Sequence, residues 1–158
     1  MDRISLTTLP LSAKVLITCF VMAIGVGYSI SILQVRARTR LDRQETIRHF
    51  RGSEGPPGIY LPQSSGTIIS VAHVHSFSQP VVLALLSFLL LFTGLSELSK
   101  TIWILISFLG SLMNILSPWL IRDLSPHAVY LLYLSGGALL VSFLVMALSI
   151  IHETWKKA

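Results

Sequence analysis

The run SVAHVHSFSQPVVLALLSFLLLFTG (residues 70–94) contains no Asp, Glu, Lys or Arg. Its most apolar part, residues 81–95, is only fifteen residues long, whereas a helix needs about 20 apolar residues to cross the hydrocarbon of a bilayer. The missing length must come from the preceding residues, so we expect a membrane helix over about residues 71–95, with a kink at Pro80. This helix carries three polar side chains into the membrane or its polar margin, namely His73, His75 and Gln79.

Three other stretches lack charged residues and are long enough to span a bilayer, at residues 15–35, 101–121 and 124–151. Hydrophobic residues make up 53% of the 158-residue chain and charged residues only 12%, which leaves too little polar surface for a soluble domain. The connections SELSK and RDLSP are too short to cross a membrane, so the helices that they join are antiparallel neighbours. The predicted fold class is therefore an all-α integral membrane protein, a four-transmembrane-helix antiparallel bundle with spans at about residues 11–33, 71–95, 101–121 and 127–151.

Between the first two spans we expect an extramembrane segment of roughly 35–45 residues, a basic helical extension followed by a loop over about residues 34–70. The extension QVRARTRLDRQETIRHF (residues 34–50) keeps the register of the first helix and spaces Arg38 and Asp42 for an i,i+4 ion pair. Gly52 is expected to end it. The residues that follow are rich in Gly, Pro and Ser, which is typical of an irregular loop.

Two local patterns predict further details of the bundle. Ala23, Gly27 and Ser31 recur at four-residue spacing on the first span, and we expect this small-residue face to pack inward. Before the fourth span, Ser125 is a suitable N-cap and Pro126 stands at the favoured first helical position.

An even number of spans places both termini on one side of the membrane, the terminal side, and the long loop on the other, the loop side. Four of the five histidines belong to the loop side, namely His49, His73, His75 and His127. The loop side also carries seven of the twelve Lys and Arg residues. The positive-inside rule therefore favours a cytoplasmic loop, by a margin that leaves the orientation undetermined.

The candidate site collects polar side chains from the loop-side half. Asn114 lies among small polar residues on the third span, and it should face the bundle because an amide exposed to lipid loses its hydrogen bonds. His127 lies near the N-terminus of the fourth span, where the helix dipole favours the neutral imidazole that haem iron or a metal binds. One interpretation is therefore coordination of one b-type haem by His73 or His75 with His127. Alternatively, these histidines hydrogen-bond to Gln79 or Asn114 at a polar helix junction, or bind a quinone or a lipid head group.

The HVH pair leaves two conformations open. His73 and His75 diverge by about 200° if the segment is helical and point the same way if it is extended. A helical segment turns one ring to the bundle and the other to lipid, a partner subunit or a second cofactor. An extended segment lets both rings, together with His49, hold one copper or zinc ion.

The sequence contains no motif that is typical of the common enzyme classes. It contains no nucleotide-binding glycine loop, paired-carboxylate site or nucleophile triad, and no acidic residue falls inside a span. We therefore expect no catalytic activity of the chain on its own. The single cysteine, Cys19, excludes an intrachain disulfide. The net charge is +5, but the basic residues are not interspersed with aromatic residues as on a nucleic-acid-binding surface. This pattern favours phospholipid or an acidic protein as the partner rather than nucleic acid.

Four segments carry a resemblance to known proteins: HFRG at residues 49–52, HVHSFSQP at 73–80, SPWLIR at 117–122 and HETW at 152–155. With an H-x-H followed five residues later by proline, the chain resembles small four-span proteins of the bacterial inner membrane that accompany respiratory or cytochrome systems. The resemblance implies a subunit of a redox complex. A looser similarity to the H-x-H helix of haem-copper oxidases extends only to His73 and His75, and it implies no oxidase activity because the other ligands and spans are missing. Compared with four-span b-type cytochromes, His152 has no partner on its side, which implies at most one haem.

Together these observations predict a non-catalytic membrane subunit of a respiratory or electron-transfer complex, in contact with other redox subunits and with phospholipid. Its expected ligand is one b-type haem or a quinone near the loop side. The expected binding residues are His73, His75 and His127, with Gln79 and Asn114 in support. The alternatives are a copper- or zinc-binding or sensory membrane protein whose ligands are His73 and His75 with His127 or His49, and a purely structural subunit that contacts lipid.

Overall fold

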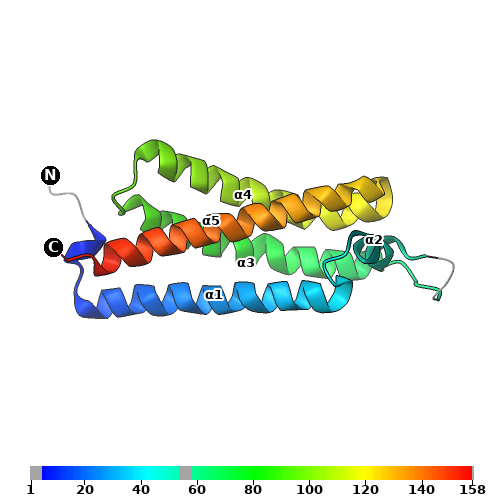
Figure 1. Cartoon of the computed structure of the whole chain (residues 1–158), viewed down its shortest axis with the longest axis horizontal. Helices are drawn as coiled ribbons and strands as arrows, with labels where there is room; N and C mark the ends of the chain where they lie inside the picture. The colour runs from blue at the N-terminus through cyan, green and yellow to red at the C-terminus, as the bar shows by residue number, and fades with distance from the viewer. Residues whose placement is uncertain (1–4, 54–57, 158) are drawn as a thin grey trace.

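The computed structural model describes residues 5–53 and 58–157 as a helical bundle. Within these residues, four helices are long and apolar enough to cross a membrane. Figure 1 shows them side by side along the long axis of the molecule, with both termini at one end and a short helix at the other. The protein is therefore a multi-pass membrane protein with the predicted four-helix architecture. The four long helices are α1 (Leu11–Thr39), α3 (Ser65–Leu91), α4 (Glu97–Trp119) and α5 (Val129–Trp155).

Helix α3 begins earlier than the sequence pattern predicted. Ser64 is its N-cap, and the Ser64 Oγ accepts a hydrogen bond of 3.1 Å from the backbone N–H of Thr67. The helix therefore starts at Ser65 rather than near Val71, and Pro80 lies in its interior. As a result, the irregular part of the loop is shorter than predicted. Residues 54–57 of that loop lie outside the described residues.

The basic extension is not a continuation of α1, so this expectation was wrong. Arg40 and Leu41 have positive φ angles of 51° and 57°, which end α1 and turn the chain. Asp42 then caps a separate helix, α2 (Arg43–Arg51), because its side chain accepts hydrogen bonds from the N–H groups of Gln44 and Glu45. Asp42 forms this cap instead of the expected ion pair with Arg38. Gly52 ends α2 as predicted, with a φ of 75°.

The connection between α4 and α5 follows the predicted capping pattern. A π-helical turn, η2 (Leu120–Leu124), extends α4, and a short 3-10 turn, η3 (Pro126–Ala128), leads into α5. Between them, the Ser125 Oγ accepts a hydrogen bond from the backbone N–H of His127, and Pro126 stands at the first helical position. Both details confirm the prediction.

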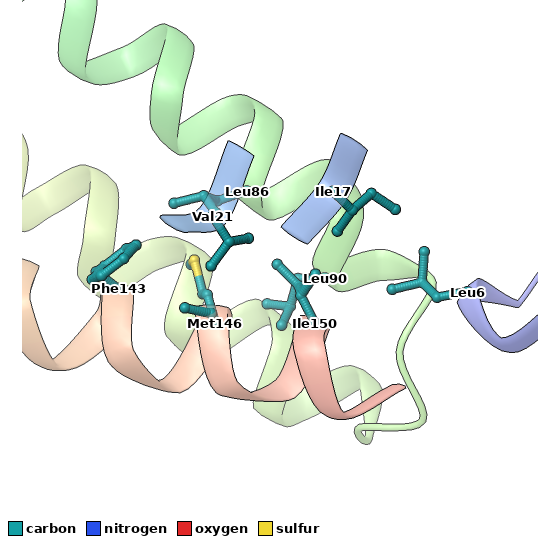
Figure 2. Packing of buried hydrophobic residues seen from close by; sticks show 9 residues of the cluster. Leu6, Ile17, Val21, Leu86, Leu90, Phe143, Met146 and Ile150 are labelled. Atoms are coloured by element: carbon teal, nitrogen blue, oxygen red, sulfur yellow. The ribbon is translucent and has the colours of Figure 1, made fainter. Parts of the chain in front are cut away.

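The hydrophobic core lies in the terminal-side half of the bundle. In Figure 2, Phe143, Met146 and Ile150 project from α5 toward residues of α1 and α3. The buried members of this cluster are Leu6, Ile17, Val21, Leu86, Leu90, Phe143, Met146, Ala147 and Ile150. Buried apolar residues of the loop-side half, among them Ile68, Ala72 and Val129, stand outside this cluster.

The small-residue face of α1 points away from the bundle, so the expected inward packing of Ala23, Gly27 and Ser31 was wrong. All three residues are exposed, and a Cβ on Gly27 would meet nothing within 4 Å. Helix α1 packs instead through larger side chains, including Tyr28, whose ring stacks on Phe143 with the centroids 4.6 Å apart. The face of α1 that packs inward is therefore the one that contacts α5, not the one with the smallest residues.

Candidate functional site

The HVH motif is helical throughout, because it lies inside α3. This confirms the helical alternative and excludes the extended arrangement in which both rings point the same way. His73 is exposed, and its ring packs edge-to-face on Phe77 with the centroids 5.1 Å apart. His75 is half-buried and turns toward the interior of the bundle. The two rings therefore have different surroundings, as a helix requires.

His75 is oriented by a short chain of hydrogen bonds from α4. The Ser111 hydroxyl donates to the Gln79 Oε1 at 2.7 Å, and the Gln79 Nε2 lies 3.1 Å from the His75 Nδ1. An amide nitrogen can only donate, so the Nδ1 is the acceptor and a neutral His75 carries its hydrogen on Nε2. Gln79, which the sequence placed in a supporting role, thereby fixes the tautomer of His75.

His75 lines a cavity of about 120 Å³ on the loop side, which we call the loop-side cavity. Its walls come from α1, α2, α3, α4, α5 and the loop before α3. The lining is mostly apolar and contains a few polar side chains. The polar lining residues are Arg38, His49, Gln63, His75 and Asn114.

Helix α2 covers the loop-side cavity and brings a second histidine to it. The Thr46 Oγ1 lies 2.7 Å from the Tyr133 Oη, and the Arg51 Nη1 donates to the Ile121 carbonyl at 3.1 Å, so α2 is tied to both α5 and η2. These contacts place His49 in the cavity wall.

His49 is also oriented by a glutamine. The Gln63 Nε2 lies 3.0 Å from the His49 Nε2, which must accept the hydrogen bond, so a neutral His49 carries its hydrogen on Nδ1. Burial lowers the pKa of His49 below its usual 6.5, and the charge of Arg38 lowers it further. Both effects favour the neutral ring. The cavity is therefore lined by two imidazoles, each of which accepts a hydrogen bond from a glutamine on one ring nitrogen and has the other nitrogen as an N–H donor.

Asn114 faces the bundle, as the sequence predicted. Its Nδ2 donates to the Ser135 Oγ across the α4–α5 contact, at 3.5 Å. The two helices approach closely there because Gly110 lies against the Ser135 carbonyl and the Leu139 side chain. The close contact brings the Asn114 amide to the inner wall of the cavity.

His127 and His73 stand outside this arrangement. His127 is exposed in the middle of the η3 turn, and neither histidine lines the loop-side cavity. The structure thus brings together His75, Asn114 and, behind His75, Gln79, but not the pairing of His73 or His75 with His127 that a bis-histidine haem site would use. Among the described residues, no group of three or more His, Cys, Asp or Glu side chains is placed to hold a metal ion.

Sequence reasoning missed Arg38 and Gln63 as cavity residues and named His49 only for the metal alternative. One signal was available, since Asp42 followed three residues later by Glu45 is the pattern that starts a new helix. A separate α2 could therefore have been predicted. Its position over the cavity could not, because that depends on contacts with α5 and η2.

A family model described as a transmembrane helical domain matches residues 40–158. This range contains α2, α3, α4 and α5, so it includes every cavity-lining residue except Arg38. No curated protein and no solved structure matches the chain.

Proposed function

The chain belongs to this family of transmembrane helical domains, and from that premise we propose that it is a non-catalytic membrane subunit of an electron-transfer assembly that binds the ring of a quinone in its loop-side cavity. The proposal places the protein in the inner membrane of a bacterium, in line with the resemblance carried by its H-x-H segment. The observation that supports the ligand most directly is the pair of oriented imidazole donors, His49 and His75, in one mostly apolar cavity.

A quinone ring matches the chemistry of this lining. The ring is flat and apolar, and it carries two carbonyl oxygens that accept hydrogen bonds. The His49 Nδ1–H and the His75 Nε2–H are donors of the required kind, and Asn114 adds an amide to the same wall. Sites for small molecules commonly combine an apolar lining with a few placed polar groups of this sort.

Size favours a quinone ring over haem. The cavity holds about 120 Å³, whereas sites that enclose a whole drug-sized ligand measure roughly 300–1,000 Å³. A single six-membered ring with its substituents suits the smaller volume, with an isoprenoid tail leaving between the helices. The bis-histidine haem expected from the sequence would need a larger slot, and His127, its expected second ligand, is exposed outside the cavity.

The electron-transfer part of the proposal follows from the ligand. Quinones carry electrons within membranes between proteins that hold redox centres, so a small chain that binds a quinone ring would act within a larger assembly. This part predicts that redox subunits co-purify with the tagged chain from its native membrane. Purification without any such subunit would overturn the electron-transfer role. It would not decide whether the chain binds a quinone, which has a separate test.

The ligand is tested by titrating decylubiquinone into the protein in detergent micelles, with calorimetry as the measurement. We expect His75→Ala to weaken binding about tenfold, since one lost hydrogen bond costs about 1–1.5 kcal/mol. His73→Ala is the matched control, because it removes the same side chain two residues away on the exposed face of α3. Its affinity should equal that of the wild type.

Two results would contradict the quinone. Equal losses in the His73 and His75 variants would show that the cavity does not provide the contact. A Soret band in the protein purified from its native membrane, together with a pyridine haemochrome signal, would show that haem is bound instead.

A further inference from the structure

The bend between α1 and α2 gathers positive charge at the loop-side end of the bundle. We define the α1–α2 elbow as residues 33–43. Its four arginines are exposed, and Arg36 and Arg38 lie in the last turn of α1, whose helix dipole favours cations there. We propose that the α1–α2 elbow binds the phosphate of an anionic phospholipid in the loop-side leaflet. The proposal is independent of the quinone. The four arginines are Arg36, Arg38, Arg40 and Arg43.

In the described part of the chain, each carboxylate in or near the elbow has a partner other than the four elbow arginines. Asp42 caps α2 by accepting two backbone hydrogen bonds. Glu45 forms an ion pair with Arg48 at 2.9 Å, outside the elbow, and Asp123 lies 3.5 Å from Arg122. The charge of the elbow therefore remains available to an external anion.

The backbone presents this charge on a bend rather than along a straight helix. Because Arg40 and Leu41 adopt positive φ angles, α2 turns away from the axis of α1 and lies across the end of the bundle, as Figure 1 shows. The Arg43 guanidinium lies 5.1 Å from the centroid of the Tyr130 ring on α5, a cation–π contact that holds one end of the elbow against the bundle. A tyrosine in this position is typical of the membrane interface.

Apolar side chains beside the arginines indicate a lipid rather than a free anion or an acidic protein. Leu33, Val35 and Leu41 are 62%, 43% and 52% exposed. A phospholipid offers a phosphate for the guanidinium groups and an acyl chain for these side chains at the same time, and clusters of four to eight basic residues next to a membrane helix are typical of anionic lipid binding. Inorganic phosphate supplies only the first of these contacts.

Native mass spectrometry of the whole chain tests the proposal. The protein is released from micelles that contain equal amounts of phosphatidylglycerol and phosphatidylcholine, and the retained lipid is counted. We expect the wild type to retain phosphatidylglycerol in preference. The double variant Arg36→Gln/Arg40→Gln should weaken that binding about 25-fold, equivalent to about 2 kcal/mol, because each basic residue near an anionic surface contributes about 1 kcal/mol.

Matched variants isolate the effect of the elbow. Lys156→Gln/Lys157→Gln removes the same charge from the terminal side and should leave the preference unchanged. Arg36→Lys/Arg40→Lys keeps the charge and should retain most of the binding. Arg36 and Arg40 lie outside the loop-side cavity, so a loss of quinone affinity is not expected from either variant.

The proposal is overturned if the wild type shows no preference for phosphatidylglycerol, a result that would favour an acidic protein as the partner. Equal losses in Arg36→Gln/Arg40→Gln and Lys156→Gln/Lys157→Gln would overturn it as well. So would binding by Arg36→Lys/Arg40→Lys that is as weak as binding by Arg36→Gln/Arg40→Gln. A final arm adds sodium phosphate or sodium chloride at the same ionic strength. Equal displacement by both salts supports the lipid, and selective displacement by phosphate would identify free phosphate as the ligand.

Discussion

At the scale of single residues, the orientation of His75 depends on Gln79. The Ser111 hydroxyl fixes the Gln79 amide, and that amide presents an N–H to the His75 Nδ1. Without Gln79 the imidazole would lose the contact that selects its tautomer, and hydrogen would distribute between its two nitrogens. Gln79, one hydrogen bond behind His75 and outside the cavity lining, thus decides whether the ring donates into the cavity or accepts.

We therefore expect Gln79→Leu to change the tautomer of His75. The measurement is the ¹⁵N spectrum of histidine-labelled protein, in which a pure Nε2–H form gives well-separated nitrogen shifts and a mixture gives intermediate ones. Ser78→Ala is the control, because the Ser78 hydroxyl donates to the Val74 carbonyl of its own helix. A spectrum of the Gln79 variant identical to that of the wild type would disprove the role of the glutamine.

His49 makes the stability of the protein depend on pH. Burial and the charge of Arg38 lower the pKa of His49 in the folded chain below the value of 6.5 that it has when unfolded. Below pH 6.5 the unfolded chain therefore takes up a proton that the folded chain resists, and the contribution of His49 to stability is lost as the pH falls from about 6.5 toward the folded pKa.

The corresponding measurement is the melting temperature between pH 7.5 and pH 5.5. We expect it to fall more steeply for the wild type than for His49→Gln, whose amide does not titrate and still offers a partner to Gln63. The other titrating groups are common to both proteins, so only the difference between the two curves is informative. Parallel curves would mean that His49 is not protected from protonation.

At the scale of elements, two glycines inside long apolar helices, Gly27 in α1 and Gly110 in α4, have opposite surroundings. A Cβ on Gly110 would lie 3.4 Å from the Leu139 Cγ and 3.5 Å from the Ser135 carbonyl oxygen, whereas one on Gly27 would meet nothing within 4 Å. A large side chain at position 110 would push α4 and α5 apart. A large side chain at position 27 would point outward from the bundle and contact no other helix.

Gly110→Leu should accordingly lower the free energy of unfolding by about 1–3 kcal/mol, the usual cost of overpacking. Gly27→Leu should not destabilise, and since both substitutions improve helix propensity equally, the difference between them reports packing alone. Unfolding in mixed micelles by titration with sodium dodecyl sulfate gives both values. If Gly27→Leu were the more harmful change, α1 would pack through its small-residue face after all.

Apolar length was enough to predict the four spans, but not the ends of helices or the face that each one buries. Ser64 and Asp42 are both visible cap residues, yet they lie in stretches whose overall composition indicated a loop and a continuous helix. The failure at Ala23, Gly27 and Ser31 has another cause, because a small-residue stripe shows where a helix can approach and not whether it does. His49 reaches the cavity only through contacts between α2 and distant parts of the chain.

At the scale of the whole molecule, four spans require that the two loop-side connections share one side of the membrane. Leu61 in the long connection and Leu124 before α5 are 85% and 74% exposed, and Leu98 at the terminal-side turn is 71% exposed. Each can be replaced by cysteine after Cys19→Ser removes the single native thiol. These positions test the topology without disturbing the core.

In spheroplasts of a bacterial host, we expect a membrane-impermeant maleimide to label Leu98→Cys directly, and Leu61→Cys and Leu124→Cys only after permeabilisation. The expected direction follows from the small excess of basic residues on the loop side, seven against five on the terminal side, which favours a cytoplasmic loop by the positive-inside rule. The two parts of this prediction can fail separately. Labelling of Leu61→Cys and Leu124→Cys from opposite sides would contradict the four-span bundle, whereas labelling of both from outside would preserve the fold and reverse its orientation, so that the α1–α2 elbow would face the outer leaflet.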